Sequence, residues 1–118
     1  MSFEVARALE QLILELESLL TDIRTIEDVQ NSREANNEIT PYVYMENTSL
    51  LKKEISSIQW VIRQLSPDQF SGIDCSSEFE DKIMDLLEQH HINANMPGAA
   101  IFLVKNKVER ILETYCED

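Results

Sequence analysis

The stretch VARALEQLILELESLLTDI, Val5 to Ile23, carries the strongest periodic signal in the sequence. Its apolar residues recur at alternating spacings of four and three as far as Ile26, the pattern of an amphipathic helix. A narrow two-column stripe would suit a two-stranded coiled coil. A third apolar column, formed by Ala6, Ile13 and Leu20, widens the stripe and suits a helix with several neighbours in a bundle. We therefore predict a core-facing helix over residues 2–31.

Length and composition limit the fold class around this helix. The chain has 118 residues, of which 43% are hydrophobic, so one domain over residues 1–118 with a real core is expected. A β-sandwich or barrel needs many turns, yet the sequence has two glycines and three prolines. We predict an all-α protein built from a few long helices.

Three further helices follow from spacing and capping signals. Thr40 and Pro41 form a cap and first-turn pair that begins a helix over residues 41–65. Capping and periodic signals place shorter helices over residues 77–91 and 98–116. The apolar opening AAIFLV of the last segment also leaves a short strand open there.

The unequal helix lengths predict an incomplete bundle. The two long helices would form an antiparallel hairpin of roughly 35–45 Å, whereas the shorter pair would reach roughly 20–30 Å. The shorter pair can therefore cover only part of the hairpin's apolar stripe. A second copy of the chain or another protein could complete the shielding, so we expect a protein partner, a homodimer or both.

The net negative charge of the chain disfavours acidic partners and is compatible with a basic one. The net charge is −12, from 22 acidic and 10 basic residues, and most of it falls in two blocks, residues 1–30 at −5 and 67–95 at −6. Nucleic acids and anionic membranes attract Lys-rich and Arg-rich proteins, so neither direct nucleic-acid binding nor membrane binding is expected. A basic target is compatible with this charge. An acidic inhibitor, of an immunity type or a mimic of nucleic-acid charge, is therefore the alternative function.

The expected compartment is the cytoplasm, or the nucleus in a eukaryote. The sequence has no apolar run of 18 residues and no signal peptide at its start. Its two cysteines, Cys75 and Cys116, indicate free thiols rather than a disulfide framework.

No residue is assigned a catalytic, cofactor-binding or metal-binding role, and an enzyme is not expected. Glu88 and His91 have the Glu-x-x-His spacing of di-iron bundles, but a second such pair is missing from the sequence. Cys75 precedes a helix, and the histidines stand at that helix's far end, so a Cys–His pair is not expected. No glycine-rich phosphate loop is present.

Three apolar residues fall outside the apolar stripes and are the candidate partner-binding residues: Leu14, Leu50 and Trp60. Trp is strongly enriched at binding hot spots, although the shorter helices or Phe70 or Ile73 could also cover Trp60. The basic segments, residues 52–54 and 105–110, are interpreted as solvated faces. The predicted function is a non-enzymatic protein–protein interaction module, as a small subunit, adaptor or dimerising scaffold.

Overall fold

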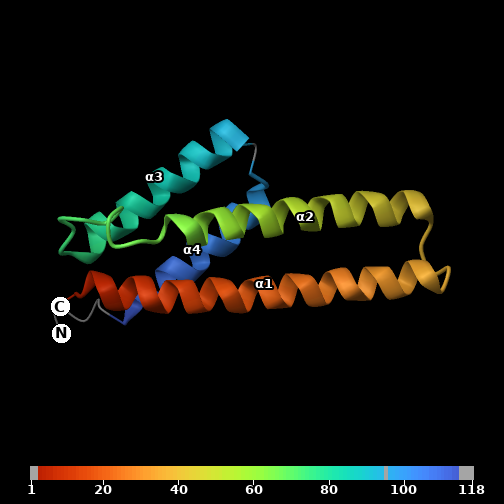
Figure 1. The fold of residues 1–118 in the computed structure, drawn as a ribbon, viewed down its shortest axis with the longest axis horizontal. Helices are drawn as coiled ribbons and strands as arrows, with labels where there is room; N and C mark the ends of the chain where they lie inside the picture. The colour runs from red at the N-terminus through yellow and green to blue at the C-terminus, as the bar shows by residue number, and fades with distance from the viewer. Residues whose placement is uncertain (1–2, 95, 115–118) are drawn as a thin grey trace.

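The computed structural model describes residues 3–94 and 96–114, which form four helices and no strand. α1 spans Val5–Ala35, α2 Pro41–Gln64, α3 Ser76–Ala94 and α4 Gly98–Glu113. The prediction of an all-α fold with a long antiparallel hairpin and two shorter helices is confirmed (Figure 1). The segment that left a strand open lies inside α4.

α1 continues past its expected end at residue 31 because Arg33, Glu34 and Ala35 all favour helix. The helix then ends in a Schellman motif. Asn37 adopts a left-handed φ of 60°, its N–H donates to the Glu34 carbonyl at 3.0 Å, and the Glu38 N–H donates to the Arg33 carbonyl at 2.8 Å. Asn tolerates this backbone conformation better than most side chains, so the Asn-rich connection sets the tip of the hairpin.

α2 begins as the sequence indicates. The Thr40 hydroxyl accepts a hydrogen bond from the Val43 N–H at 3.2 Å, and Pro41 occupies the first turn. α3 begins at Ser76, one residue before the expected start, and continues to Ala94, three residues beyond the expected end. α4 begins at the expected Gly98 and ends at Glu113, before the expected end at residue 116. The last two residues of that expected helix, Cys116 among them, lie outside the described residues.

The core lies at one end of the molecule. The apolar stripe of α1 is buried from Ala8 to Ile23, and on α2 the buried apolar residues begin at Ile58. α4 contributes Ala100, Val104 and Val108 to the same core. Beyond α2, turns position Phe70 against Phe79 of α3, with ring centroids 5.2 Å apart. The N-terminal segment joins this cluster through Phe3, whose ring centroid lies 5.4 Å from that of Phe79.

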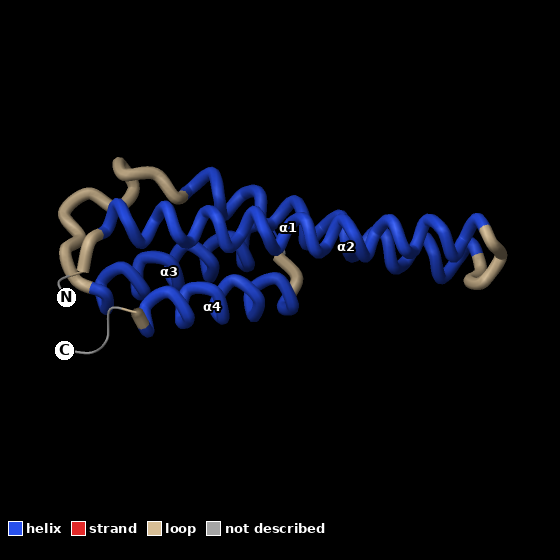
Figure 2. Tube along the Cα trace, turned by 90° about the horizontal axis from the view of Figure 1, so that it is seen from below, coloured by secondary structure: helices blue, strands red, loops and turns tan. Residues whose placement is uncertain are grey.

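The shape follows from this uneven burial. The molecule extends 54 × 28 × 20 Å, and its long dimension is set by the hairpin. α3 and α4 lie beneath only the half of the hairpin that holds the start of α1 and the end of α2 (Figure 2). The other half consists of α1 and α2 alone, as the unequal helix lengths predicted. None of the four helices has the length and apolar character needed to cross a membrane.

Candidate interaction surface

The uncovered half of the hairpin is called here the arm, and comprises residues 24–53; the other described residues form the body. The two helices of the arm are joined by side-chain hydrogen bonds rather than by a core. The Tyr44 hydroxyl donates to Asn31 Oδ1 at 2.7 Å, and Asn47 Nδ2 donates to Gln30 Oε1 at 3.1 Å. Thr48 is the one buried residue in the arm, and its hydroxyl donates to the Tyr44 carbonyl at 2.9 Å. The arm therefore has no apolar interior of its own.

Exposed apolar side chains concentrate on the arm. Among the described residues nine large hydrophobic side chains are exposed, and six of them lie on the arm: Ile26, Val29, Tyr42, Val43, Met45 and Leu50. On α2, Tyr42, Met45 and Leu50 share one outer face and border a shallow hollow of about 440 Å³. Contiguous exposed apolar surface of this kind is typical of binding sites in soluble proteins.

The arm also differs from the body in charge. Residues 24–53 hold five acidic and four basic side chains, a net charge of −1, so eleven of the twelve net negative charges lie outside the arm. Net charge of one sign keeps proteins apart by repulsion. The arm is therefore nearly neutral, whereas the other residues together carry almost all of the net negative charge.

The three candidate partner-binding residues do not form one patch. Leu14 is 64% exposed and lies beside the last turn of α4, whereas Leu50 is 51% exposed and lies on the arm. Trp60 is half-buried and stacks on His90 of α3, with ring centroids 4.1 Å apart and an interplanar angle of 7°. His90 of α3, one of the shorter helices expected to cover Trp60, contacts its indole ring. The role of Leu14, Leu50 and Trp60 in binding a partner stays a prediction.

The side chains considered for metal or catalytic chemistry are placed as follows. His91 Nδ1 forms a hydrogen bond with the Met96 carbonyl at 2.9 Å, and His91 and Glu88 line a groove between α3 and α4. Cys75 Sγ donates to Glu78 Oε1 at 3.1 Å at the start of α3, roughly 20 Å along the helix from the histidines. Cys75 and His91 therefore each have a hydrogen-bond partner close by in the sequence. The partner of Cys75 lies in the first turn of α3, and the partner of His91 lies in the connection that follows α3.

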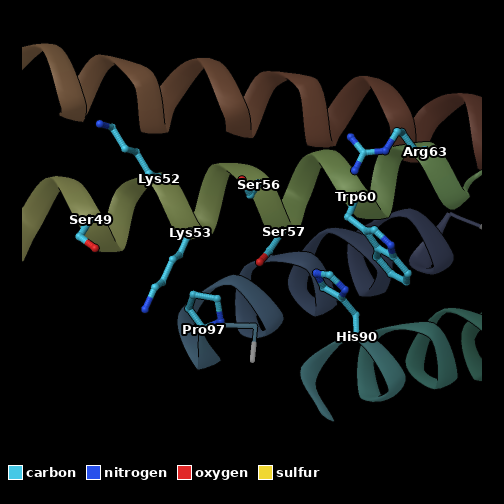
Figure 3. A pocket seen from close by; sticks show the side chains of 9 residues that line it. All are labelled: Ser49, Lys52, Lys53, Ser56, Ser57, Trp60, Arg63, His90 and Pro97. Carbon is cyan, nitrogen blue, oxygen red and sulfur yellow. The ribbon is translucent and has the colours of Figure 1, made fainter. Parts of the chain in front are cut away.

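One arrangement that the sequence did not indicate lies at the junction of arm and body. Lys52 and Lys53, interpreted as part of a solvated face, border a hollow that also includes Arg63 and His90 (Figure 3). Burial and the neighbouring Arg63 guanidinium lower the pKa of His90, so its imidazole favours the neutral form. Sequence spacing could have placed Lys53 and Arg63 on neighbouring faces of α2, but the approach of α3 had no sequence signal.

Comparison of the chain with protein-family models, with curated proteins and with solved structures finds no match.

Proposed function

We propose that this protein is a non-enzymatic helical interaction module, and that its arm binds another polypeptide. The observation that carries the proposal is the concentration of exposed apolar side chains, six of nine, on the half of the hairpin that α3 and α4 leave uncovered. Such a module would act as a small subunit, adaptor or dimerising scaffold of a complex.

The exposed apolar side chains of the arm can contribute to the free energy of binding. Fully burying a large apolar side chain contributes about 1.5–3 kcal/mol, so covering six side chains that are roughly half-exposed contributes several kcal/mol. Association itself costs at least about 4 kcal/mol in lost freedom, and this cost removes much of the gain. The apolar side chains of the arm alone therefore support a weak contact, and polar contacts around them would have to add both affinity and specificity.

The nearly neutral charge of the arm supports the same conclusion. A partner that covers the arm meets a net charge of −1 over residues 24–53, whereas the residues outside the arm sum to −11. A second copy of this chain could approach arm to arm without strong repulsion. A different acidic protein could do the same.

The test is affinity capture with the full chain from its native source, with two variants beside the wild type. Met45→Glu/Leu50→Glu places two charges on the outer face of the arm, and Phe102→Glu places one on an equally exposed apolar residue of the body. Proteins that bind the wild type and Phe102→Glu, and that are lost with the arm variant, support the proposal. Sedimentation of the purified chain at increasing concentration shows whether a second copy is the partner.

Two outcomes would contradict the proposal. Capture that is unaffected by the arm variant would place the binding surface elsewhere. Capture of one basic protein by a monomeric chain, in a manner that weakens steeply with salt and ignores the arm, would favour the acidic inhibitor instead.

A further inference from the structure

The outer face of the arm is a surface formed by α2 alone. It is defined here by the residues that border the shallow hollow of about 440 Å³: Tyr42, Met45, Glu46, Ser49, Leu50 and Lys53. All of them are exposed, and their spacings of three and four place them on one side of the helix. Because every one of them belongs to α2, another helix could lie directly along this face.

The two ends of the outer face carry opposite charges. Glu46 lies three residues before Ser49, and Lys53 lies three residues after Leu50, so the charges are placed symmetrically about the centre of the face. They are separated by roughly 10 Å along the helix, which is too far for an ion pair within one chain. Glu46 accepts a hydrogen bond from the Tyr42 hydroxyl at 3.3 Å, and among the described residues Lys53 forms no ion pair. Both charged groups are therefore accessible to a partner.

This arrangement of charges is self-complementary. In a two-fold dimer the same patch of both copies forms the interface, and each contact occurs twice. If two copies of α2 cross antiparallel at Ser49 and Leu50, Glu46 of each copy lies opposite Lys53 of the other. A parallel crossing would instead place Glu46 against Glu46 and Lys53 against Lys53. The charges of the outer face therefore favour an antiparallel pairing and oppose a parallel one.

The shape of α2 has the same symmetry. Tyr42 is 71% exposed and lies seven residues before Ser49, whereas Ser57 lies seven residues after Leu50. Ser49, Ser57 and Trp60 line the hollow of about 500 Å³ at the junction of arm and body, and they project from the side of α2 that is turned away from α1 (Figure 3). An antiparallel crossing therefore brings the protruding Tyr42 ring of each copy to the hollow of the other.

The charge of the rest of the chain agrees with an antiparallel crossing. The residues outside the arm sum to −11, so two bodies placed side by side would repel each other. In the antiparallel crossing the two bodies lie at opposite ends of the paired arms. The repulsion between them is then largely screened, since the Debye length is about 8 Å at physiological ionic strength.

We propose that the occupant of the arm is a second copy of this chain, docked antiparallel through the outer face of α2. The inference rests on the proposed function, because it names the polypeptide that the arm binds. Met45 and Leu50 of both copies form the apolar centre of the interface, and two ion pairs between Glu46 and Lys53 flank it. Exposed ion pairs add little affinity, so the dimer is weak and the pairs mainly fix its orientation. Its dissociation constant should lie below about 1 mM.

The experiment measures self-association of the full chain by sedimentation equilibrium at constant ionic strength. Glu46→Lys and Lys53→Glu should each weaken the dimer at least about fivefold, because each variant replaces two attractive contacts by two repulsive ones. An equimolar mixture of the two variants should recover the affinity of the wild type, because the mixed dimer again pairs opposite charges at both contacts. In a parallel dimer neither single variant would weaken association, since like charges already face each other there.

The matched control is Glu109→Lys, a charge reversal at an exposed residue of α4 that should leave the dimer unchanged. It alters the net charge by the same amount as Glu46→Lys, and amide NMR spectra show whether each variant is folded. A wild-type chain that stays monomeric at about 1 mM overturns the inference. A dimer that both single variants leave unchanged, or that Glu109→Lys weakens equally, also overturns it. If a monomeric chain still captures another protein through the arm, the proposed function holds and only this inference fails.

Discussion

The body and the arm both contain parts of α1 and α2, but the apolar side chains of these two helices are buried mainly in the body. In the body, the apolar stripes of α1 and α2 are covered by α4 and by the cluster around Phe79. In the arm, the stripe of α1 continues to Ile26 and Val29, and both side chains are about half-exposed. One helix can therefore be buried along half of its length and exposed along the other half. Whether its apolar stripe is buried depends on which other segments pack against it, and not on the helix itself.

The largest expected difference between the two regions is in stability. Leu16→Ala, in the fully buried stretch of α1, should lower the free energy of unfolding by about 2–5 kcal/mol because it leaves a cavity. Leu50→Ala, the same change on the arm, should alter it by less than about 0.5 kcal/mol. Urea denaturation followed by circular dichroism measures both. Equal losses would mean that the arm is as tightly packed as the body.

Trp60→Ala tests the contact that closes the body at its border with the arm. Trp60 is half-buried, so its loss should cost about 1–3 kcal/mol, less than a fully buried aromatic residue. Faster hydrogen exchange should be confined to the last turns of α3, where His90 loses its stacking partner. Unchanged stability with a separate loss of partner binding would instead make Trp60 a binding residue.

Tyr44→Phe tests the hydrogen bond that joins the two helices of the arm. Removing the hydroxyl that donates to Asn31 should cost about 0.5–1 kcal/mol, because the bond is solvent-exposed. The matched control is Tyr42→Phe, since the Tyr42 hydroxyl contacts Glu46 within the same helix at 3.3 Å. Only Tyr44→Phe should speed hydrogen exchange at the tip of the hairpin. Identical exchange in both variants would show that this bond does not hold the arm together.

Glu54→Gln should have the smallest effect, an increase in stability of about 0.5 kcal/mol at neutral pH. Burial raises the pKa of Glu54 above its ordinary value, so the folded state disfavours the ionised carboxylate. The cost is fully present above the folded pKa and disappears as the pH falls through it. The gain from Glu54→Gln should therefore vanish at acidic pH in paired denaturation curves. A destabilising effect at neutral pH would contradict this reasoning.

Sequence periodicity was sufficient to predict the helices of the body and the part of the hairpin that the shorter helices leave uncovered. The stripe from Leu9 to Ile23 and the pair Thr40–Pro41 are local signals, and the structure uses both as expected. The excess length of the hairpin also followed from counting residues against the shorter segments. These features depend on neighbours along the chain, which a single sequence displays directly.

The details of the surface depend on contacts between distant segments. The stack of Trp60 on His90, and the hollow bordered by Lys53, Arg63 and His90, require the end of α3 to lie beside α2, and no spacing in the sequence predicts that approach. The continuation of α1 to Ala35 was missed because Asn31 and Ser32 resemble a connection, although Asn37 provides the actual stop. Periodicity predicted that Leu14 and Leu50 are exposed, but it did not predict that they lie on separate parts of the surface.

The most direct test of the account is residue-resolved hydrogen exchange of the dilute chain, repeated after association with a captured partner or at high chain concentration. In the dilute chain, amides of residues 24–53 should exchange at least about tenfold faster than those of the buried stretch of α1, because the arm has no apolar interior. Association should slow exchange in the arm and leave the body unchanged. An arm that is as protected as the body in a dilute monomer, with no change on association, would contradict the account.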